Sequence, residues 1–274
     1  MKRTRNGILI PDVPIMAGGN LPNAVKGVSV GNDKPLDPLD VHCPFFIKNE
    51  SADVAQIKIY KRGNDSPSIE IDFSQNAKDW ETIGTTSTDG LYINILPHSK
   101  LYLRAEISSW ASSTMSNSSN SINVDKAYSI GGNILSLLYG EEFSGQTEFK
   151  NDSANAFIAL FRDDGNLIDA SSLQLNAKLV PLNAYDSMFT NCTSLESAPI
   201  IKGQTLRNGS CSILFKDCPK INRIECHATN PSTQQFNNWV QNVALNGTFI
   251  KKRGVEWPTG TSGIPIGWTV EEID

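Results

Sequence analysis

The feature that most constrains this chain is a short pattern that occurs twice between residues 185 and 226. An apolar residue is followed by Phe-x-x-Cys-x-x-Leu or Ile, first from Met188 and again from Leu214. A weaker copy starts at Leu160 and has Gly165 in the Cys position. The phenylalanines stand at positions 161, 189 and 215, so the pattern recurs every 26 to 28 residues. A period in this range predicts a solenoid, in which each unit buries its apolar face against its neighbours.

The pattern also predicts which side chains form the core of the repeats. Equivalent positions of successive units stack on one another, so the aromatic, small and aliphatic residues should form continuous buried columns. The expected core residues are Phe161, Gly165, Leu167, Phe189, Cys192, Leu195, Phe215, Cys218 and Ile221.

Within each unit the apolar spacing just before the Phe is that of a helix. A longer run of this kind follows the last repeat, where Asn230 and Pro231 supply a helix cap and first turn and Gly247 supplies a stop. Phe236, Trp239 and Val240 would share one face of that helix. We therefore expect residues 130–274 to form a repeat domain closed by a C-terminal capping helix.

Residues 39–129 follow a different period. Apolar and polar residues alternate in short runs, such as 55–61 and 91–95, and Gly, Pro, Asn and Ser separate the runs. This pattern predicts an immunoglobulin-like antiparallel β-sandwich. The fold class expected for the chain is therefore mainly β, with a sandwich followed by a short solenoid.

Residues 1–38 predict an extended arm that precedes the folded part. Five prolines and five glycines interrupt both helix and strand, and residues 1–30 carry four Lys or Arg against one Asp. A flexible terminus is the simple interpretation, but residues 8–16 are too apolar for a solvated tail. We expect the arm to order against another subunit, with Arg3, Arg5, Ile8, Ile10, Val13 and Ile15 as candidate anchoring residues.

Composition excludes several classes of protein. A net charge of −5 argues against a general nucleic-acid binder, and no apolar run approaches the roughly 20 residues of a membrane span. The apolar run after Arg5 is too short for a signal peptide, so we expect a chain that is not exported by the general secretory route. In that setting the five cysteines are expected to be reduced and buried.

The motifs of common enzymes are not found in the sequence. A split zinc site from His42, Cys43, Cys226 and His227 lacks the usual ligand spacing. The segment Asp163-Asp164-Gly165-Asn166 lacks the alternating carboxylates of a calcium loop. Adjacent Glu141 and Glu142 would point to opposite faces of a strand. We therefore expect a non-enzymatic protein with no cofactor and no metal.

The Phe-x-x-Cys-x-x-Leu units resemble the leucine-rich repeats of the BspA-like surface-protein family. The block NILSLLYGEEF at 133–143 resembles the segment before such repeats, and the blocks at 247–251 and 257–270 resemble their closing segment. The resemblance covers roughly residues 130–274. Proteins with this ending occur on Bacteroides cell surfaces and in virions of phages that infect these bacteria, including crAss-like phages.

The resemblance implies a choice between two locations. An adhesin of the bacterial surface would need an export signal, whereas a virion protein assembles in the host cytoplasm and leaves by lysis. We therefore expect a virion protein, such as a head fibre or other capsid appendage, with a surface adhesin as the alternative and an accessory of a glycan-active enzyme as a third. Expected partners are capsid or other virion proteins through residues 1–38 and copies of the same chain, with a trimer favoured. The candidate outer face for a host glycan or protein comprises Glu196, Lys216, Lys220 and Arg223.

Overall fold

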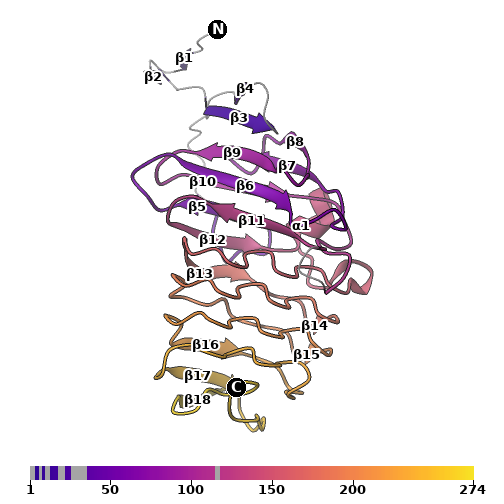
Figure 1. Ribbon diagram of the computed structural model, residues 1–274, viewed down its shortest axis with the longest axis vertical. Coiled ribbons are helices and arrows are strands. Elements are labelled where there is room, and N and C mark those ends of the chain that lie inside the picture. The colour runs from indigo at the N-terminus through magenta and orange to yellow at the C-terminus, as the bar shows by residue number, and fades with distance from the viewer. Residues whose placement is uncertain (1–3, 6–7, 10–12, 18–21, 26–35, 115–117) are drawn as a thin grey trace.

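The computed structural model describes residues 4–5, 8–9, 13–17, 22–25, 36–114 and 118–274, and only the backbone of those before residue 36. The chain is mainly β, as the sequence predicts (Figure 1). Its one α-helix in these ranges is a single turn, α1 (Ser136–Tyr139). Two short 3-10 turns, η1 (Gly140–Phe143) and η2 (Lys150–Asp152), follow it. The molecule is long, with β3 and β4 near one end and β16, β17 and β18 near the other.

The first half of the chain forms two sheets that share one hydrophobic core. The five-stranded sheet has the order β11-β6-β9-β3-β4, and the six-stranded sheet has the order β13-β12-β5-β10-β7-β8. Along β6 buried and half-buried residues alternate, which matches the period of two in the sequence. The strands are β3 (Val13–Ala17), β4 (Pro22–Val25), β5 (Phe46–Asn49), β6 (Ala55–Lys61), β7 (Glu70–Ser74), β8 (Glu81–Thr85), β9 (Leu91–Ile95), β10 (Lys100–Arg104), β11 (Asn120–Val124), β12 (Tyr128–Asn133) and β13 (Leu167–Gln174).

Part of the predicted arm belongs to the five-stranded sheet. β1 (Thr4–Arg5) pairs with β2 (Ile8–Leu9), and β3 pairs with both β9 and β4. Pro14 can lie in β3 because pairing with β9 begins only at Ile15, so no hydrogen bond to β9 is lost. Of the six candidate anchoring residues, Arg5, Ile8, Val13 and Ile15 lie in these strands, and Arg3 and Ile10 lie outside the described residues.

The second half of the chain is a stack of turns that run parallel to one another. β12 pairs in parallel with β13, and β14 (Leu179–Val180) pairs in parallel with β15 (Thr205–Leu206). The last three turns contribute β16 (Arg223–Cys226), β17 (Thr248–Lys252) and β18 (Thr269–Ile273), again in parallel. Since β12 also pairs with β5, the stack continues directly from the six-stranded sheet.

The predicted domain boundary at residues 129 and 130 therefore falls inside a strand. β12 is paired on both sides, and buried residues from Phe45 to Trp268 form one continuous core. The division into 39–129 and 130–274 stays a prediction. In the structure these two parts share a sheet and a core.

The opposite side of the stack is held by a second ladder of backbone hydrogen bonds. The amide of Phe161 donates to Met188, that of Phe189 donates to Leu214, and that of Phe215 donates to Trp239, at 3.0, 3.1 and 2.8 Å. Every second backbone amide donates in this way to a carbonyl of the next turn. Many of the amides between them donate to the carbonyl three residues earlier in the same turn. This arrangement requires a positive φ at every fourth residue: Asn155, Ala159, Asp163, Asn183, Ser187, Asn191, Gly209, Ile213, Asp217, Asn238 and Asn242. Most of these are Asn, Asp or Gly, the residues that tolerate the left-handed region best.

The predicted C-terminal capping helix is wrong. Residues 230–246 form another turn of the stack, in which Val240 has the backbone position of Phe215 and the Trp239 ring packs against the Phe215 ring. The apolar spacing at Phe236, Trp239 and Val240 is the same as before each Phe, but positive φ at Asn238 and Asn242 prevents a helix there.

The loop before β18 covers the turn at 230–246 in place of the helix. The indole Nε1 of Trp239 donates to the carbonyl of Gly263 at 2.8 Å, and the amide of Asn238 donates to Ser262 Oγ at 2.9 Å. The amide of Val240 donates to the carbonyl of Thr261 at 3.2 Å. These bonds satisfy donors that would otherwise face the end of the stack.

A row of aromatic rings runs through the core from the sheets to the last turn. We call it the aromatic column, and it consists of Phe45, Phe161, Phe189, Phe215 and Trp239. Successive ring centroids are 6.0, 5.6, 5.7 and 6.0 Å apart, and the Phe161, Phe189 and Phe215 rings are nearly parallel. All five side chains are fully buried. Offset stacking at this distance adds to the free energy gained from burial.

We expect Phe189→Ala to lower the free energy of unfolding by about 3–5 kcal/mol, because it leaves a cavity in the middle of the aromatic column. Chemical denaturation followed by circular dichroism would measure the change. Lys216→Ala, a part-exposed position on the neighbouring turn, should change stability by no more than about 0.5 kcal/mol. A loss of less than about 1 kcal/mol for the Phe189 variant would show that the column is not essential.

We expect Ile213→Asn to stabilise the protein, because Ile213 is β-branched and has a φ of 41°. The left-handed region costs an ordinary residue roughly 1–2 kcal/mol, and Asn238 already occupies the equivalent position of the next turn. A gain of about 1 kcal/mol would raise the melting temperature by about 2–4 °C. Ser212→Asn, one residue earlier, is the control, and equal melting temperatures for the two variants would contradict the role of φ.

Candidate binding surface

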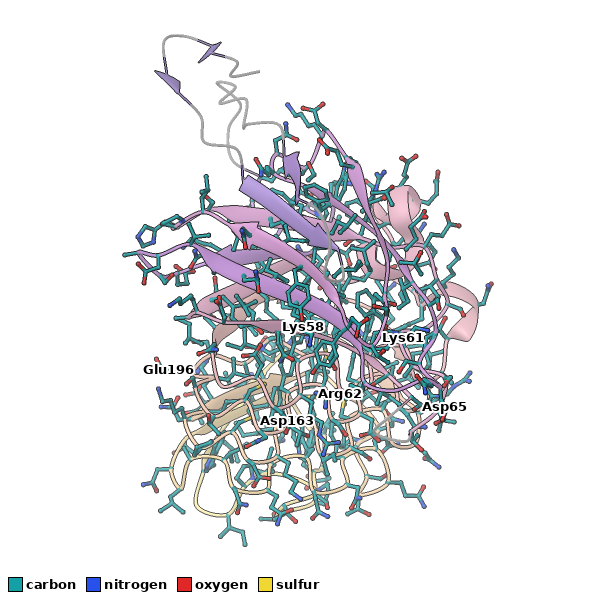
Figure 2. All side chains as sticks on the ribbon, turned by 45° about the horizontal axis from the view of Figure 1, so that its top comes forward. Lys58, Lys61, Arg62, Asp65, Asp163 and Glu196 are labelled. Atoms are coloured by element: carbon teal, nitrogen blue, oxygen red, sulfur yellow. The ribbon has the colours of Figure 1, made fainter. Side chains whose placement is uncertain are left out.

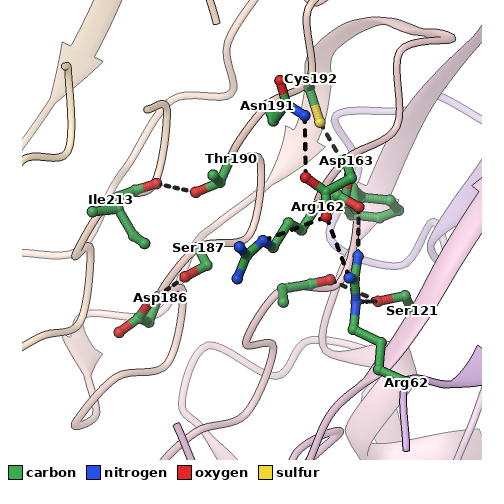
Figure 3. Close-up of polar contacts among 12 residues, drawn as sticks. Arg62, Ser121, Arg162, Asp163, Asp186, Ser187, Thr190, Asn191, Cys192 and Ile213 are labelled. Carbon is green, nitrogen blue, oxygen red and sulfur yellow. Dashed lines mark hydrogen bonds and ion pairs between the residues drawn. The ribbon is translucent and has the colours of Figure 1, made fainter. Parts of the chain in front are cut away.

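The cysteines of the repeat pattern link successive turns. Cys192 Sγ donates to the carbonyl of Phe161 at 3.1 Å (Figure 3). Cys218 Sγ donates to the carbonyl of Phe189 at 2.9 Å. Burial raises the pKa of Cys218 to about 12, so its thiol stays protonated and can donate. All five cysteines are buried and free, as the sequence predicts. Their role is structural.

The Cys position of the first repeat is occupied by Asp164, not by Gly165. The amides of Asp163 and Asn191 make equivalent bonds to the following turns, which aligns Asp164 with Cys192. Asp164 is also the third residue after its Phe, as the cysteines are, so the spacing alone could have identified it. The other predicted core residues, from Phe161 to Ile221, are fully buried.

The Asp164 carboxylate fastens the sheets to the first turn of the stack. Its Oδ2 accepts hydrogen bonds from Tyr128 Oη at 2.9 Å, the Val124 amide at 3.1 Å and Asn123 Nδ2 at 3.2 Å. Its Oδ1 accepts from the Asn166 amide at 2.9 Å. Burial raises the pKa of Asp164, and these four hydrogen bonds oppose the increase. Because the carboxylate is saturated by the protein itself, it is a structural group.

We expect Asp164→Asn to lower the free energy of unfolding by about 1–3 kcal/mol, because an amide NH₂ would face donors that need an acceptor. The matched control is Asp163→Asn, which keeps the left-handed residue and removes its part-exposed ion pairs with Arg62 and Arg162, each worth about 0–1 kcal/mol. Thermal denaturation of both variants would decide the matter. Equal losses would argue against the special role of Asp164.

Arg62 makes a second connection between the sheets and the stack. Directly after β6, its Nε donates to Ser121 Oγ and its Nη2 donates to the carbonyl of Arg162, both at 2.6 Å (Figure 3). Its Nη1 lies 3.4 Å from Asp163 Oδ2. The Arg62 side chain is only 15% exposed. No sequence pattern marks Arg62, because its partners Ser121 and Arg162 lie far from it along the chain.

The predicted outer face does not form a single cluster of free charges. Lys220 pairs with Glu196 at 2.9 Å, and Arg223 pairs with Glu271 at 3.9 Å. Lys216 takes part in neither pair and lies in the turn that bonds to Asn191. Glu225 and His227 form a further pair, and we call this surface the paired-charge face: Glu196, Lys220, Arg223, Glu225, His227 and Glu271. Each of these charges already has a partner.

A different surface lies on the outside of the five-stranded sheet. Lys58 of β6 stands opposite Tyr92 of β9 and Asn123 of β11, and Gln56 stands opposite Asn94. The Lys58 ammonium is 4.7 Å from the ring centroid of Tyr60 and 5.6 Å from that of Tyr92. We call this surface the tyrosine face: Gln56, Lys58, Tyr60, Tyr92, Asn94 and Asn123. Figure 2 shows Lys58 above Arg62 and Asp163 on one side of the molecule.

Other potential sites hold no chemistry that we can identify. In the described part of the chain, no group of three or more His, Cys, Asp or Glu side chains is placed to hold a metal ion. His42 contacts Ser144 Oγ, and His227 pairs with Glu225. Glu141 pairs with Arg104 at 2.8 Å on the surface. No helix within the described ranges has the length and apolar character of a membrane span.

A small hollow lies where the loop between β9 and β10 meets the sheets. Its volume is about 180 Å³, and Gln75, Asn94, Leu96 and Lys100 are among its lining residues. Sites for small molecules usually measure about 300–1,000 Å³. This hollow is therefore too small to be the main binding site.

Comparisons of the chain with protein-family models, with curated proteins and with solved structures find no significant match. The function therefore has to be inferred from the geometry of the chain's own residues.

Proposed function

We propose that this protein is a non-enzymatic structural component of a bacteriophage particle, an appendage such as a head fibre attached to the capsid. The observation that carries the proposal is the arrangement of the chain along its length. The arm strands lie near one end, and the stack of turns extends to the other (Figure 1). An anchor at one end and a rigid body at the other suit a protein that projects from a surface.

The fold proposed for this body is an immunoglobulin-like sandwich followed by a short BspA-like leucine-rich-repeat solenoid. Its support is the regular spacing of the aromatic column and the thiol bonds from each Cys to the previous Phe. Turns that bury their apolar side only against each other are the basis of a solenoid. The resemblance in sequence covers the same residues.

The arm is the proposed attachment to capsid or other virion proteins. Residues 1–30 are basic on an acidic protein, so the arm suits an acidic groove of a neighbouring subunit. β3 pairs with β9, so a force applied to the residues before Val13 would be transmitted to the five-stranded sheet. The particle would form in the host cytoplasm, and we expect the appendage to be a homo-oligomer, with a trimer favoured.

The second candidate function is a cell-surface adhesin of the same repeat family. The tyrosine face favours it equally, because a binding surface on a rigid body would serve either protein. The two functions differ in location only. Immunogold labelling with an antibody against this protein would place it on phage particles or on the bacterial envelope.

We expect deletion of residues 1–12 to reduce incorporation into particles at least tenfold while leaving the melting temperature within about 2 °C, because β3 and β4 remain in place. Purified particles from a host that supplies the variant would be assayed by immunoblot. Glu196→Gln, on the paired-charge face, is the control and should be incorporated normally. Normal incorporation of the truncated chain would contradict the anchoring role of the arm.

A further inference from the structure

We propose that the tyrosine face is a binding site for a glycan that carries carboxylate groups, such as a chain of uronic acids. The inference holds for a virion protein and for an adhesin alike, since it concerns the chemistry of one surface and not its location. It assigns ligand binding to the five-stranded sheet, away from the paired-charge face.

The first reason is the state of the Lys58 ammonium. It lies in the notch between the Tyr60 and Tyr92 rings, and no described carboxylate forms an ion pair with it. By contrast, Lys150, which lies 5.8 Å from the Tyr139 ring, pairs with Glu106 at 3.1 Å. Cation–π contacts strengthen when water is excluded, so a ligand that covers the notch would meet an oriented positive charge. A carboxylate is the complement of that charge.

The second reason is the room for the Lys58 stem beside Gly90. Gly90, which has a φ of +95°, lies beside Lys58 and Tyr60. A Cβ at this position would approach Lys58 Cε to 2.9 Å and Cγ to 3.2 Å. The bare backbone of Gly90 therefore leaves the space that the lysine stem occupies.

The third reason is the set of groups around the notch. Gln56 Nε2 donates to Asn94 Oδ1 at 3.4 Å, and Tyr92 Oη donates to the carbonyl of Asp89 at 3.0 Å. An amide side chain can make more bonds than the one used here, so Gln56 and Asn94 retain donors and acceptors for hydroxyl groups. The tyrosine rings supply apolar area for the faces of sugar rings. Aromatic area, amides and one cation on one face of a sheet fit a carboxylated sugar chain.

The overall charge of the protein does not prevent such a contact. The chain carries a net charge of −5, but exposed charges farther apart than about 8 Å are largely screened at physiological ionic strength. Lys58 places a positive charge beside the Tyr60 and Tyr92 rings. On the paired-charge face, the same ligand would have to displace existing partners such as Glu196 from Lys220.

The test uses the full chain and affinity electrophoresis in gels that contain polygalacturonate. We expect the wild-type protein to be retarded, and we expect Lys58→Gln and Tyr92→Ala each to weaken binding at least tenfold. The matched control is Lys150→Gln, which alters a lysine beside a tyrosine elsewhere and should bind within twofold of wild type. Fully methyl-esterified polygalacturonate should bind at least tenfold more weakly than the acid form.

Three results would overturn the proposal. One is the absence of wild-type retardation in polygalacturonate and in alginate. Another is wild-type affinity for the acid polymer in the Lys58 variant. The third is that dextran sulfate retards the wild-type protein as strongly as polygalacturonate does and retards the Tyr92→Ala variant to the same extent. That result would indicate non-specific attraction to polyanions. None of these results would alter where the protein is located, so they are distinct from failure of the virion assignment.

Discussion

The stacking of Phe45, Phe161, Phe189, Phe215 and Trp239 is the interaction on which the rest of the structure depends. These rings come from the residue just before β5 and from four successive turns, and each is buried by its neighbours. No turn of the stack could bury its own ring alone, so each is stable only with the next. The same column joins the two halves of the chain, because the Phe45 ring packs against the Phe161 ring across the predicted domain boundary.

Around this column the buried backbone amides all need hydrogen-bond acceptors. A buried turn cannot leave its amides unpaired, and a helix of a few residues would leave most of them so. A positive φ at every fourth residue lets alternate amides point to the next turn, as at Asn155, Asp163 and Asn191. The side chains of Asn191 and Asp163 then bond to each other at 3.1 Å between turns. The Asn and Asp residues of the repeat thus allow the left-handed backbone conformation and also form hydrogen bonds between turns.

Electrostatics divides the surface into regions with different capacity for binding. Arg62 and Asp164 are used to fasten the sheets to the stack, and the paired-charge face is occupied by its own ion pairs. Exposed ion pairs of this kind contribute little to stability, and they also leave few charges for a partner. Lys58 differs because its neighbours in the described structure are aromatic rings.

The sequence by itself determined the mainly β character, the two periods and the buried columns at Phe189, Cys192 and their equivalents, because a repeated apolar pattern admits few arrangements. It failed at Phe236 to Val240, where the same apolar spacing fits a helix or a turn with left-handed residues. Only contact with the neighbouring segments decides between them: the turn before donates to the carbonyls of Asn237 and Trp239, and the loop that follows accepts from the amides of Asn238 and Val240. The pairing of Lys58 with Tyr92 and of Asp164 with Tyr128 also required the tertiary structure, because register between distant strands is set by packing and not by local pattern.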